Sequence, residues 1–254
     1  MAADKDPQFA STLANGIDVL LCFQPGESSL ANKDFAQRTG LSRPAVARLT
    51  HTLEALGCLR RDETQARYRL GAAVLNIAYP LLASMRIRPI GRPLMEALAR
   101  SIEGAVSLGV RHRTHMVYVE SARHEEFETW PDIGRPLPML SSAMGRAWLA
   151  CAPAAERRTV LNQIRVSDPE GFQRHHAAAE AARLEYQRHG LCGSRAQRQA
   201  HGYRFAVPLH GLVDNLQFVL NCGVRADRST YAQLRREIGP QLVTTARDME
   251  ALLK

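Results

Sequence analysis

The chain has 254 residues, 45% of them hydrophobic, which is enough apolar material for one large domain or two small ones. Its net charge of +8 and isoelectric point near 9.7 favour an anionic partner. No apolar run approaches the ~18 residues that cross a bilayer, and the acidic start MAADKDPQFAS lacks the apolar segment of a signal peptide. We therefore expect a soluble, cytoplasmic protein without a membrane partner.

The five cysteines are odd in number and widely spaced, and no C-x-x-C pair occurs. This pattern is typical of reduced thiols and excludes a disulfide framework. It agrees with the expected location inside the cell.

The first predicted helix covers residues 12–24, with Ser11 as its N-cap. After the break at PGESSL, Asn32 is expected to cap a second helix that stops at Gly40. The apolar residues of the first helix fall on one stripe: Leu13, Ile17, Leu20 and Leu21.

The third predicted helix begins after Ser42, its N-cap, and carries Pro44 in the first turn, where a missing N–H costs little. Gly57 ends it. Two short helices that meet through TGLS form the tight, glycine-containing turn of a helix-turn-helix. One face of the third helix is apolar: Val46, Leu49, Leu53 and Leu56.

The opposite face of the third helix is predicted to contact DNA. Small side chains let a helix enter the major groove, where arginine pairs with guanine edges or phosphates. The free amides at the start of a helix also favour phosphate. The alternative is a solvated amphipathic helix with ordinary surface arginines. The predicted contacts are Ser42, Arg43, Pro44, Ala45, Ala47, Arg48 and His51.

The next segment, CLRRDETQARYRLG, is typical of a strand, a polar turn and a second strand, over residues 58–62, 63–66 and 67–70. A basic hairpin directly after a recognition helix has the position of a wing. From there Arg67 and Arg69 are predicted to reach the DNA backbone or the minor groove. The combination of elements favours DNA binding over the solvated helix.

This N-terminal sequence resembles the DNA-binding domain of IclR-family bacterial transcriptional regulators. It departs from the family pattern at Ala45, where the family often has Thr, so a hydroxyl for a phosphate or base is absent. The resemblance extends more thinly to the C-terminus and implies a regulator rather than an enzyme. The pattern A-x-x-T-G-L-S-x-x-T-V-x-R-L-L-x-x-L matches at Ala36, Thr39, Gly40, Leu41, Ser42, Val46, Arg48, Leu49 and Leu53.

Residues 72–85, AAVLNIAYPLLASM, are apolar on most sides, which predicts a helix buried against the DNA-binding domain and a second subunit. In the family, such a helix links the domains and joins the first helix in dimer contacts. Groove geometry also requires a dimer, because two half-sites lie about one helical turn apart. We expect a homodimer or a dimer of dimers. The predicted domains are 1–71 (DNA binding), 72–85 (linker and dimerisation helix) and 86–254 (effector binding).

From residue 86 onward, predicted helices alternate with strands of period two. The strands are AVSLGV, HMVYVESA, YRFAVPLHG and NLQFVLNCGV, the last two forming a hairpin across residues 212–214. Few, long helices around antiparallel strands predict an α+β domain. The resemblance implies a GAF-like sheet with an effector pocket. The predicted fold class is thus an all-α winged helix-turn-helix followed by an α+β domain with an antiparallel sheet.

The resemblance also implies where an effector binds. The family typically holds the effector's carboxylate or carbonyl with amides at the start of a short helix, here Ala143 and Met144. Polar side chains then come from the last strands. A gap-free reading places Ser194 where the family often has Asp and Arg204 where it often has Cys. The family's later S-x-S falls on Leu220 and Cys222.

These replacements predict an organic carboxylate that is larger and more apolar than small oxo-acids, with an aromatic acid as one candidate. Arg204 would supply a charged fork, and Met139, Met144 and Tyr118 a flexible lining. The alternative is that Arg204 points to solvent above an apolar core. Trp130 is either a lid residue or a packed aromatic.

No catalytic constellation or cofactor motif stands out, and we expect no cofactor. A pairing of Cys192 with His201 lacks the spacing of any nucleophile motif. The histidines at 112, 115, 175 and 176 favour exposed imidazoles over a metal site. Two rival classes remain: an enzyme acting on a small acid or amide with an appended DNA-binding domain, and an architectural DNA binder that ignores ligands.

Overall fold

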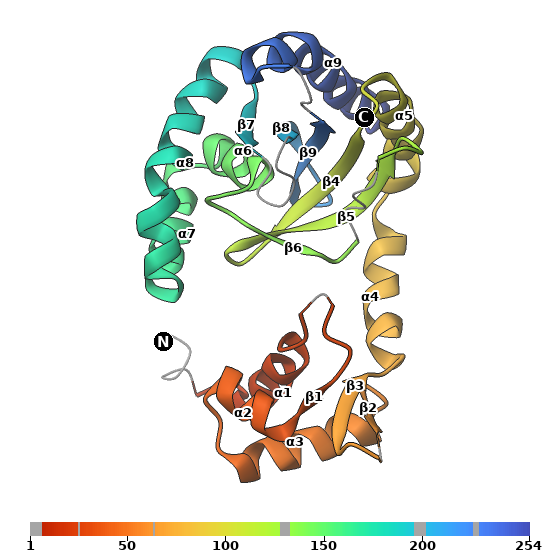
Figure 1. Ribbon diagram of the computed structural model, residues 1–254, viewed down its shortest axis with the longest axis vertical. Coiled ribbons are helices and arrows are strands. Elements are labelled where there is room, and N and C mark those ends of the chain that lie inside the picture. The colour runs from red at the N-terminus through yellow and green to blue at the C-terminus, as the bar shows by residue number, and fades with distance from the viewer. Residues whose placement is uncertain (1–6, 25, 63, 128–132, 196–201, 226–228) are drawn as a thin grey trace. The chain divides into compact units, whose positions relative to one another are not determined.

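The computed structural model describes residues 7–24, 26–62, 64–127, 133–195, 202–225 and 229–254 (Figure 1). Contacts divide the chain into two compact units, Met1–Ser84 and Met85–Lys254. Among the described residues, no helix combines the length and hydropathy that a membrane span requires.

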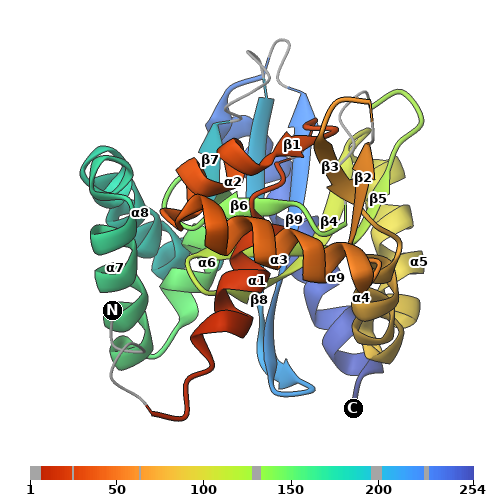
Figure 2. The same cartoon turned by 90° about the horizontal axis from the view of Figure 1, so that it is seen from below.

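The N-terminal unit is a three-helix arrangement with a small antiparallel sheet in the order β1-β3-β2, followed by a fourth helix. Figure 2 looks onto α3, with the β2–β3 hairpin beyond its C-terminal end. The elements are α1 (Ser11–Leu21), β1 (Leu30–Ala31), α2 (Asn32–Thr39), α3 (Arg43–Ala55), β2 (Leu59–Asp62), β3 (Arg67–Leu70) and α4 (Ala73–Ser84).

The core of this unit forms around Phe35, which is fully buried and has ring neighbours in Phe23 and Tyr68 at 5.6 and 6.2 Å. Val46 and Leu53 bring the predicted apolar face of α3 into the same cluster. Helix α3 and the hairpin therefore share one hydrophobic core, to which Tyr68 anchors the wing.

The ends of the helices agree only partly with the predicted caps. The Ser42 hydroxyl accepts a hydrogen bond from the Ala45 amide at 3.4 Å, and Gly40 adopts a left-handed φ of 73°, as predicted. Ser11 and Asn32 are wrong as caps, because each is the first residue of its helix. At α2 the Asp34 carboxylate accepts from the Ala31 amide at 2.8 Å.

Two glycines close the base of the wing. Gly57 ends the turn after α3 with a φ of 70°, and the Gly71 amide donates to the Cys58 carbonyl at 2.8 Å. A Cβ at Gly71 would lie 2.0 Å from the Gly57 carbonyl oxygen. Only glycine permits this close approach of the two chain segments.

Two helices of this unit carry apolar side chains that the protomer leaves exposed. Leu13, Ile17 and Leu21 of the predicted stripe of α1 are exposed, Leu20 packs against the core, and Gly16 and Val19 are the buried residues. No residue of α4 is buried, which corrects the predicted burial of this helix against the DNA-binding domain, although Ala73 and Val74 at its start pack against that domain's core. The exposed fractions are Leu13 66%, Ile17 48%, Leu21 59%, Leu75 72%, Ile77 69%, Tyr79 70% and Leu81 56%.

The C-terminal unit is built on a six-stranded antiparallel sheet in the order β6-β5-β4-β9-β8-β7 (Figure 1). Helix α6 packs against one face and against α8, and α5 and α9 contact strands on the other side. The elements are α5 (Ile87–Ser101), β4 (Ala105–His112), β5 (His115–Arg123), β6 (Pro136–Pro138), α6 (Ala143–Cys151), α7 (Ala154–Ser167), α8 (Pro169–His189), β7 (Cys192–Arg195), β8 (Gly202–Val213), β9 (Leu216–Arg225) and α9 (Tyr231–Leu252).

The predicted fold class is confirmed, with two local differences. The turn of the last hairpin is Asp214–Asn215, one residue beyond the predicted segment, and both residues have positive φ as this tight turn requires. The short strands β1, β6 and β7 were not predicted. They pair two to four residues each, which is too short for a periodic sequence signal.

An irregularity in the β4–β5 register decides which side chains face α6. Leu108 pairs with Glu120, but the next residue, Gly109, pairs with Tyr118. The extra residue, Val119, breaks the usual alternation. Tyr118 and Ser121 therefore lie on one face of the sheet, while Glu120 lies on the other, where Arg88 of α5 forms an ion pair with it at 3.2 Å.

Candidate nucleic-acid interface and effector face

The predicted DNA-contacting residues of α3 lie together on its outer surface. Ala45 is the exception, because it is half-buried at the edge of this surface. Thr52, which sequence reasoning did not single out, is exposed on the same helix, and its hydroxyl donates to the Arg48 carbonyl at 3.0 Å. The exposed residues are Ser42, Arg43, Pro44, Ala47, Arg48 and His51.

The two arginines of this surface are free to bind a partner. In the described parts of the chain, the guanidinium groups of Arg43 and Arg48 have no hydrogen-bond or ion-pair partner. Beneath them Thr50 is fully buried and donates to the Val46 carbonyl at 3.0 Å. The outer face of the helix is therefore positively charged and open to a partner, while its inner face is held in the core.

The wing arginines predicted to reach DNA have partners within the unit. Arg67 donates from Nε to the Ser29 hydroxyl at 2.9 Å and from Nη2 to the Ser29 carbonyl at 2.7 Å. Its Nη2 also lies 3.5 Å from the Asp34 carboxylate. Arg69 lies 3.7 Å from the Asp62 carboxylate. Arg67 in particular ties the wing to the segment before β1, which is a structural task.

Two other basic residues of the wing are better placed for an outside partner. Arg60 and Arg61 are exposed on β2, an edge strand of the small sheet. Their guanidinium groups have no ion-pair partner among the residues that the structure describes. Sequence reasoning assigned the two strands correctly, but it could not reveal the Ser29 partner of Arg67, which lies 38 residues away in sequence.

In the C-terminal unit, α6 begins with free amides beside the sheet. The Ser142 hydroxyl caps the helix by accepting from the Gly145 amide at 3.0 Å. No backbone acceptor in the described residues takes the amides of Ala143 and Met144. A Cβ at Gly145 would lie 2.3 Å from the Met139 carbonyl oxygen, so glycine lets the preceding loop lie directly on the helix.

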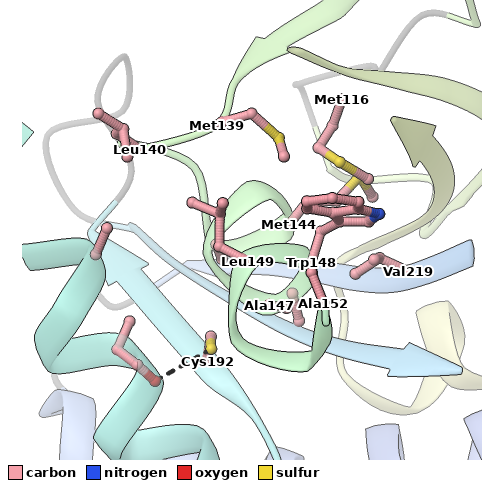
Figure 3. Close-up of a cluster of buried hydrophobic side chains, with 14 of the residues drawn as sticks. Met116, Met139, Leu140, Met144, Ala147, Trp148, Leu149, Ala152, Cys192 and Val219 are labelled. Atoms are coloured by element: carbon pink, nitrogen blue, oxygen red, sulfur yellow. Dashed lines mark hydrogen bonds between the residues drawn. The ribbon is translucent and has the colours of Figure 1, made fainter. Parts of the chain in front are cut away.

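The side chains around α6 are largely apolar. Figure 3 shows Met139, Met116 and Met144 close to Trp148, with Val219 of β9 beneath them. The predicted methionine lining is therefore part of a closely packed core cluster. Flexible, unbranched side chains of this kind adapt to neighbours of irregular shape.

A row of buried polar side chains crosses this face of the sheet. Cys192 and Ala206, which pack with α6, fix the side to which the row belongs. The Ser107 and Ser121 hydroxyls are 2.9 Å apart, and Asn221 makes no side-chain hydrogen bond with the described residues. Strand pairing aligns Cys192, Ala206, Asn221, Ser107 and Ser121 across five neighbouring strands.

Arg204 lies on the same face, in the next row. It pairs with Ser194 on one side and with Gly223 on the other. A Cβ at Gly223 would lie 2.6 Å from the Arg204 Nη1, so the guanidinium crosses directly over this glycine. It then stands 6.0 Å from the Phe127 ring centroid. The alternative in which Arg204 points to solvent is wrong.

Tyr118 completes this group from β5. Burial raises the pKa of its phenol, and the nearby Arg204 and Arg135 act in the opposite direction. The structure thus brings Tyr118, Ser194 and Arg204 to the side of the sheet that also holds the start of α6. We call this surface the effector face. It comprises Tyr118, Ser194 and Arg204 together with Ser107, Ser121 and Asn221.

Two predicted effector residues do not belong to the effector face. Leu220 and Cys222 are fully buried on the opposite side of the sheet. Cys222 pairs directly with Phe205, whose ring stacks on Tyr231 of α9 at 5.3 Å. Asn221, which lies between Leu220 and Cys222, is the residue whose side chain faces the same side of the sheet as Ser107 and Ala206. A shift of one residue exchanges the faces of a strand.

The described residues hold no group of three or more His, Cys, Asp or Glu side chains that would suit a metal ion. Cys192 is fully buried, its thiol donates to the Ala182 carbonyl at 3.3 Å, and burial raises its pKa (Figure 3). A thiol in this state is a poor nucleophile. Its proposed partner His201, and Trp130, lie outside the described residues.

Two sequence families match the chain. The IclR helix-turn-helix domain matches residues 12–63, and the C-terminal domain of bacterial transcriptional regulators of the IclR type matches residues 80–251. The second match alone covers more than half of the chain.

Two transcriptional regulators align with this chain over nearly its whole length. The transcriptional regulator TsaQ1/TsaQ2 of Comamonas testosteroni is 28% identical over 96% of this chain and 88% of its own. The Pca regulon regulatory protein of Pseudomonas putida is 24% identical over 96% and 84%.

Solved structures share the architecture. An IclR family transcriptional regulator from Brucella abortus has a TM-score of 0.90 and 34% identity, covering 98% of this chain and 95% of the other. An IclR homologue from Microbacterium hydrocarbonoxydans, complexed with 4-hydroxybenzoate, has a TM-score of 0.68 and 21% identity over 94% and 99% of the two chains.

Proposed function

Because the chain belongs to the IclR family of bacterial transcriptional regulators, with a DNA-binding domain at its N-terminus, we propose that α3 and the wing bind a specific operator and that an organic acid controls this binding. The observation that carries the proposal is the pair of unpartnered arginines on α3, Arg43 and Arg48. The relatives named above are regulators, which favours this function over an enzymatic one.

On the DNA side, exposed arginines at the start of a helix suit guanine edges or phosphates. The small residues Ala45 and Ala47 allow the backbone to approach the base pairs closely. Arg60 and Arg61 of the wing add positive charge next to α3 and would contact the DNA backbone. Binding of this kind depends strongly on salt, because each phosphate contact releases counterions.

On the effector side, we propose an organic carboxylate, with aromatic acids as the first class to test. The free amides of Ala143 and Met144 and the guanidinium of Arg204 suit a carboxylate. Asn221 and the Ser107–Ser121 pair suit a further polar substituent on the ligand. The homologue from Microbacterium hydrocarbonoxydans that was solved with 4-hydroxybenzoate is one precedent for such a ligand in this fold.

We further propose that the exposed apolar faces of α1 and α4 form the dimer contact. Seven large side chains on these two helices are between 48% and 72% exposed in the protomer. Apolar patches of this size on a soluble protein mark sites of association. Pairing the recognition helices on two half-sites gives such a contact a function.

Control of DNA binding then follows from coupling between two equilibria. An effector that prefers one arrangement of the C-terminal units changes the spacing of the recognition helices, and DNA changes effector affinity by the same factor. Such coupling is typically about 1–3 kcal/mol, or one to two decades in operator affinity.

The test is fluorescence anisotropy with labelled DNA from upstream of the protein's own gene and with scrambled DNA, each at several salt concentrations. We expect the specific DNA to bind at least ~1,000-fold more tightly, with an affinity that falls steeply as salt rises. Addition of single aromatic acids should then shift the operator affinity. Equal and weak binding to both DNAs, with and without these acids, would contradict the proposal.

A further inference from the structure

A cavity of the C-terminal unit is lined by residues of α6, α8, β7 and α9. It has a volume of about 540 Å³ and opens between α8, β7 and the first turns of α9, which adjoin one another in Figure 1. We call it the α8–α9 cleft. Its lining is Arg146, Ala178, Ala181, Ala182, Leu184, Glu185, Arg188, His189, Gly193, Tyr231 and Arg235.

The single carboxylate of the cleft, Glu185, already has its partners. It accepts hydrogen bonds from the Tyr231 hydroxyl and from the Gly193 amide, the latter at 3.2 Å. Arg235 pairs with it at 3.4 Å. Glu185 therefore neutralises one arginine and has little capacity left for the others.

Two further arginines of the cleft lack an acidic partner. Arg146 is half-buried, donates from Nε to the Leu140 carbonyl at 2.8 Å and reaches the Gly193 carbonyl at 3.4 Å. Arg188 is exposed at the mouth. Neither forms an ion pair with a residue that the structure describes. With Glu185 counted, the cleft carries a net charge of +2 and spare N–H donors.

Part of the cleft's lining is apolar. Ala178, Ala181 and Ala182 recur at the spacing that places them on one face of α8, and Leu184 follows beside them. Small side chains here leave room, and the cationic end lies at the C-terminal turns of the same helix. The cleft thus combines one charged end with one apolar side.

We propose that the α8–α9 cleft is a second ligand site, which binds an amphipathic organic anion: a carboxylate head against Arg146, Arg188 and Arg235, and a short apolar body along α8. Its volume falls within the range of small-molecule sites. No residue of the effector face lines the cleft, and the proposal does not depend on the effector assignment.

The test is isothermal titration calorimetry of the full-length protein with octanoate. We expect R188Q and A181W each to weaken octanoate binding at least 10-fold, the first by removing a cation and the second by filling the apolar side. R174Q and A177W are matched controls, because both positions are exposed on α8 outside the cleft. Both controls should bind octanoate like the wild type.

Two further arms separate the outcomes. R204Q should leave octanoate binding in the cleft unchanged, and inorganic phosphate, a head without a body, should bind more weakly than octanoate. Octanoate binding that survives both R188Q and A181W, or that disappears in R204Q, would place the ligand elsewhere and overturn the proposal. No octanoate binding to the wild type would overturn it as well.

Discussion

Arg48 on α3 and Arg204 on β8 are both proposed to meet an anion, but they are held in opposite ways. Arg48 is exposed, and its guanidinium has no partner in the described residues. Arg204 is packed across Gly223 and stands over Phe127. Arg48 is accessible to a large partner such as DNA, whereas Arg204 is accessible only to a small molecule that enters the domain.

This contrast explains why the two sites differ in how far a sequence reveals them. An exposed helix face depends on local periodicity, which a single sequence contains. The effector face depends on register among five strands, where one residue decides which side chain points to α6. The following changes break or sharpen the comparison, from the largest expected effect to the smallest.

Reversing both charges on α3 should remove operator recognition. For R43E/R48E we expect a loss of about 1,000-fold in operator affinity, down to the level of non-specific DNA. Fluorescence anisotropy measures the effect, and effector binding to the C-terminal unit should not change. R158E, at an exposed position of α7, is the control for net charge. Unchanged operator affinity in R43E/R48E would refute the role of α3.

The two faces of β9 should respond differently to substitution. Leu220 is fully buried on the side of the sheet opposite the effector face, so L220A should cost about 2–5 kcal/mol of stability and leave effector affinity unaltered in the folded fraction. N221L should do the reverse, weakening effector binding about 10-fold at a modest cost in stability. Urea unfolding and calorimetry with the acid that acts in the operator assay distinguish the two. The opposite pattern would mean that the effector face is assigned to the wrong side.

The wing offers a smaller test of the same contrast. R60Q should weaken DNA binding a few-fold and reduce the salt slope by about 1, as expected for the loss of one phosphate contact. R67Q should instead lower stability by about 1–2 kcal/mol, because it removes the contacts with Ser29 and Asp34. Equal salt slopes in the wild type and R60Q would argue against the edge strand as the DNA contact.

The smallest effect concerns Glu27 and pH. Hydrogen bonds from both Nη atoms of Arg38, at 2.6 Å, lower the pKa of Glu27 from 4.5 to about 2. A depressed folded-state pKa means that this stabilisation is present above about pH 4.5 and is lost as the pH falls toward 2. The difference in melting temperature between wild type and E27Q should therefore shrink between pH 6 and pH 3. A constant difference would show that Glu27 does not titrate in this window.

Local chemistry predicted much of the N-terminal unit. The Ser42 cap, the left-handed Gly40 and the apolar face of α3 each follow from residues within one or two turns. Contacts between residues far apart in sequence could not be predicted in this way. Arg67 donates a hydrogen bond to Ser29, whereas Arg60 has no such partner among the described residues. Nothing in the sequence alone shows which of the two arginines is held within the unit.

In the C-terminal unit, the four long strands could be predicted from the sequence, but the side of the sheet to which each side chain points could not. The irregularity at Val119 turns Tyr118 and Ser121 to one side, and no composition signal marks it. Asn221 could have been noticed as a polar residue within a buried apolar strand. Alternation along β9 then leaves Leu220 and Cys222 in the core against α9.

In helix α4, Ala73 and Val74 pack against the core of the N-terminal unit, and none of the helix's residues is buried. A helix of its 12 residues is marginal in water by itself, because nucleation costs more than so short a run of hydrogen bonds returns. Pro80 removes one of those bonds as well. The stability of helix α4 therefore depends on what covers its exposed apolar side chains. Any partner that buries Leu75, Ile77, Tyr79 and Leu81 would shift the helix–coil equilibrium of this segment toward the helix and make it stiffer.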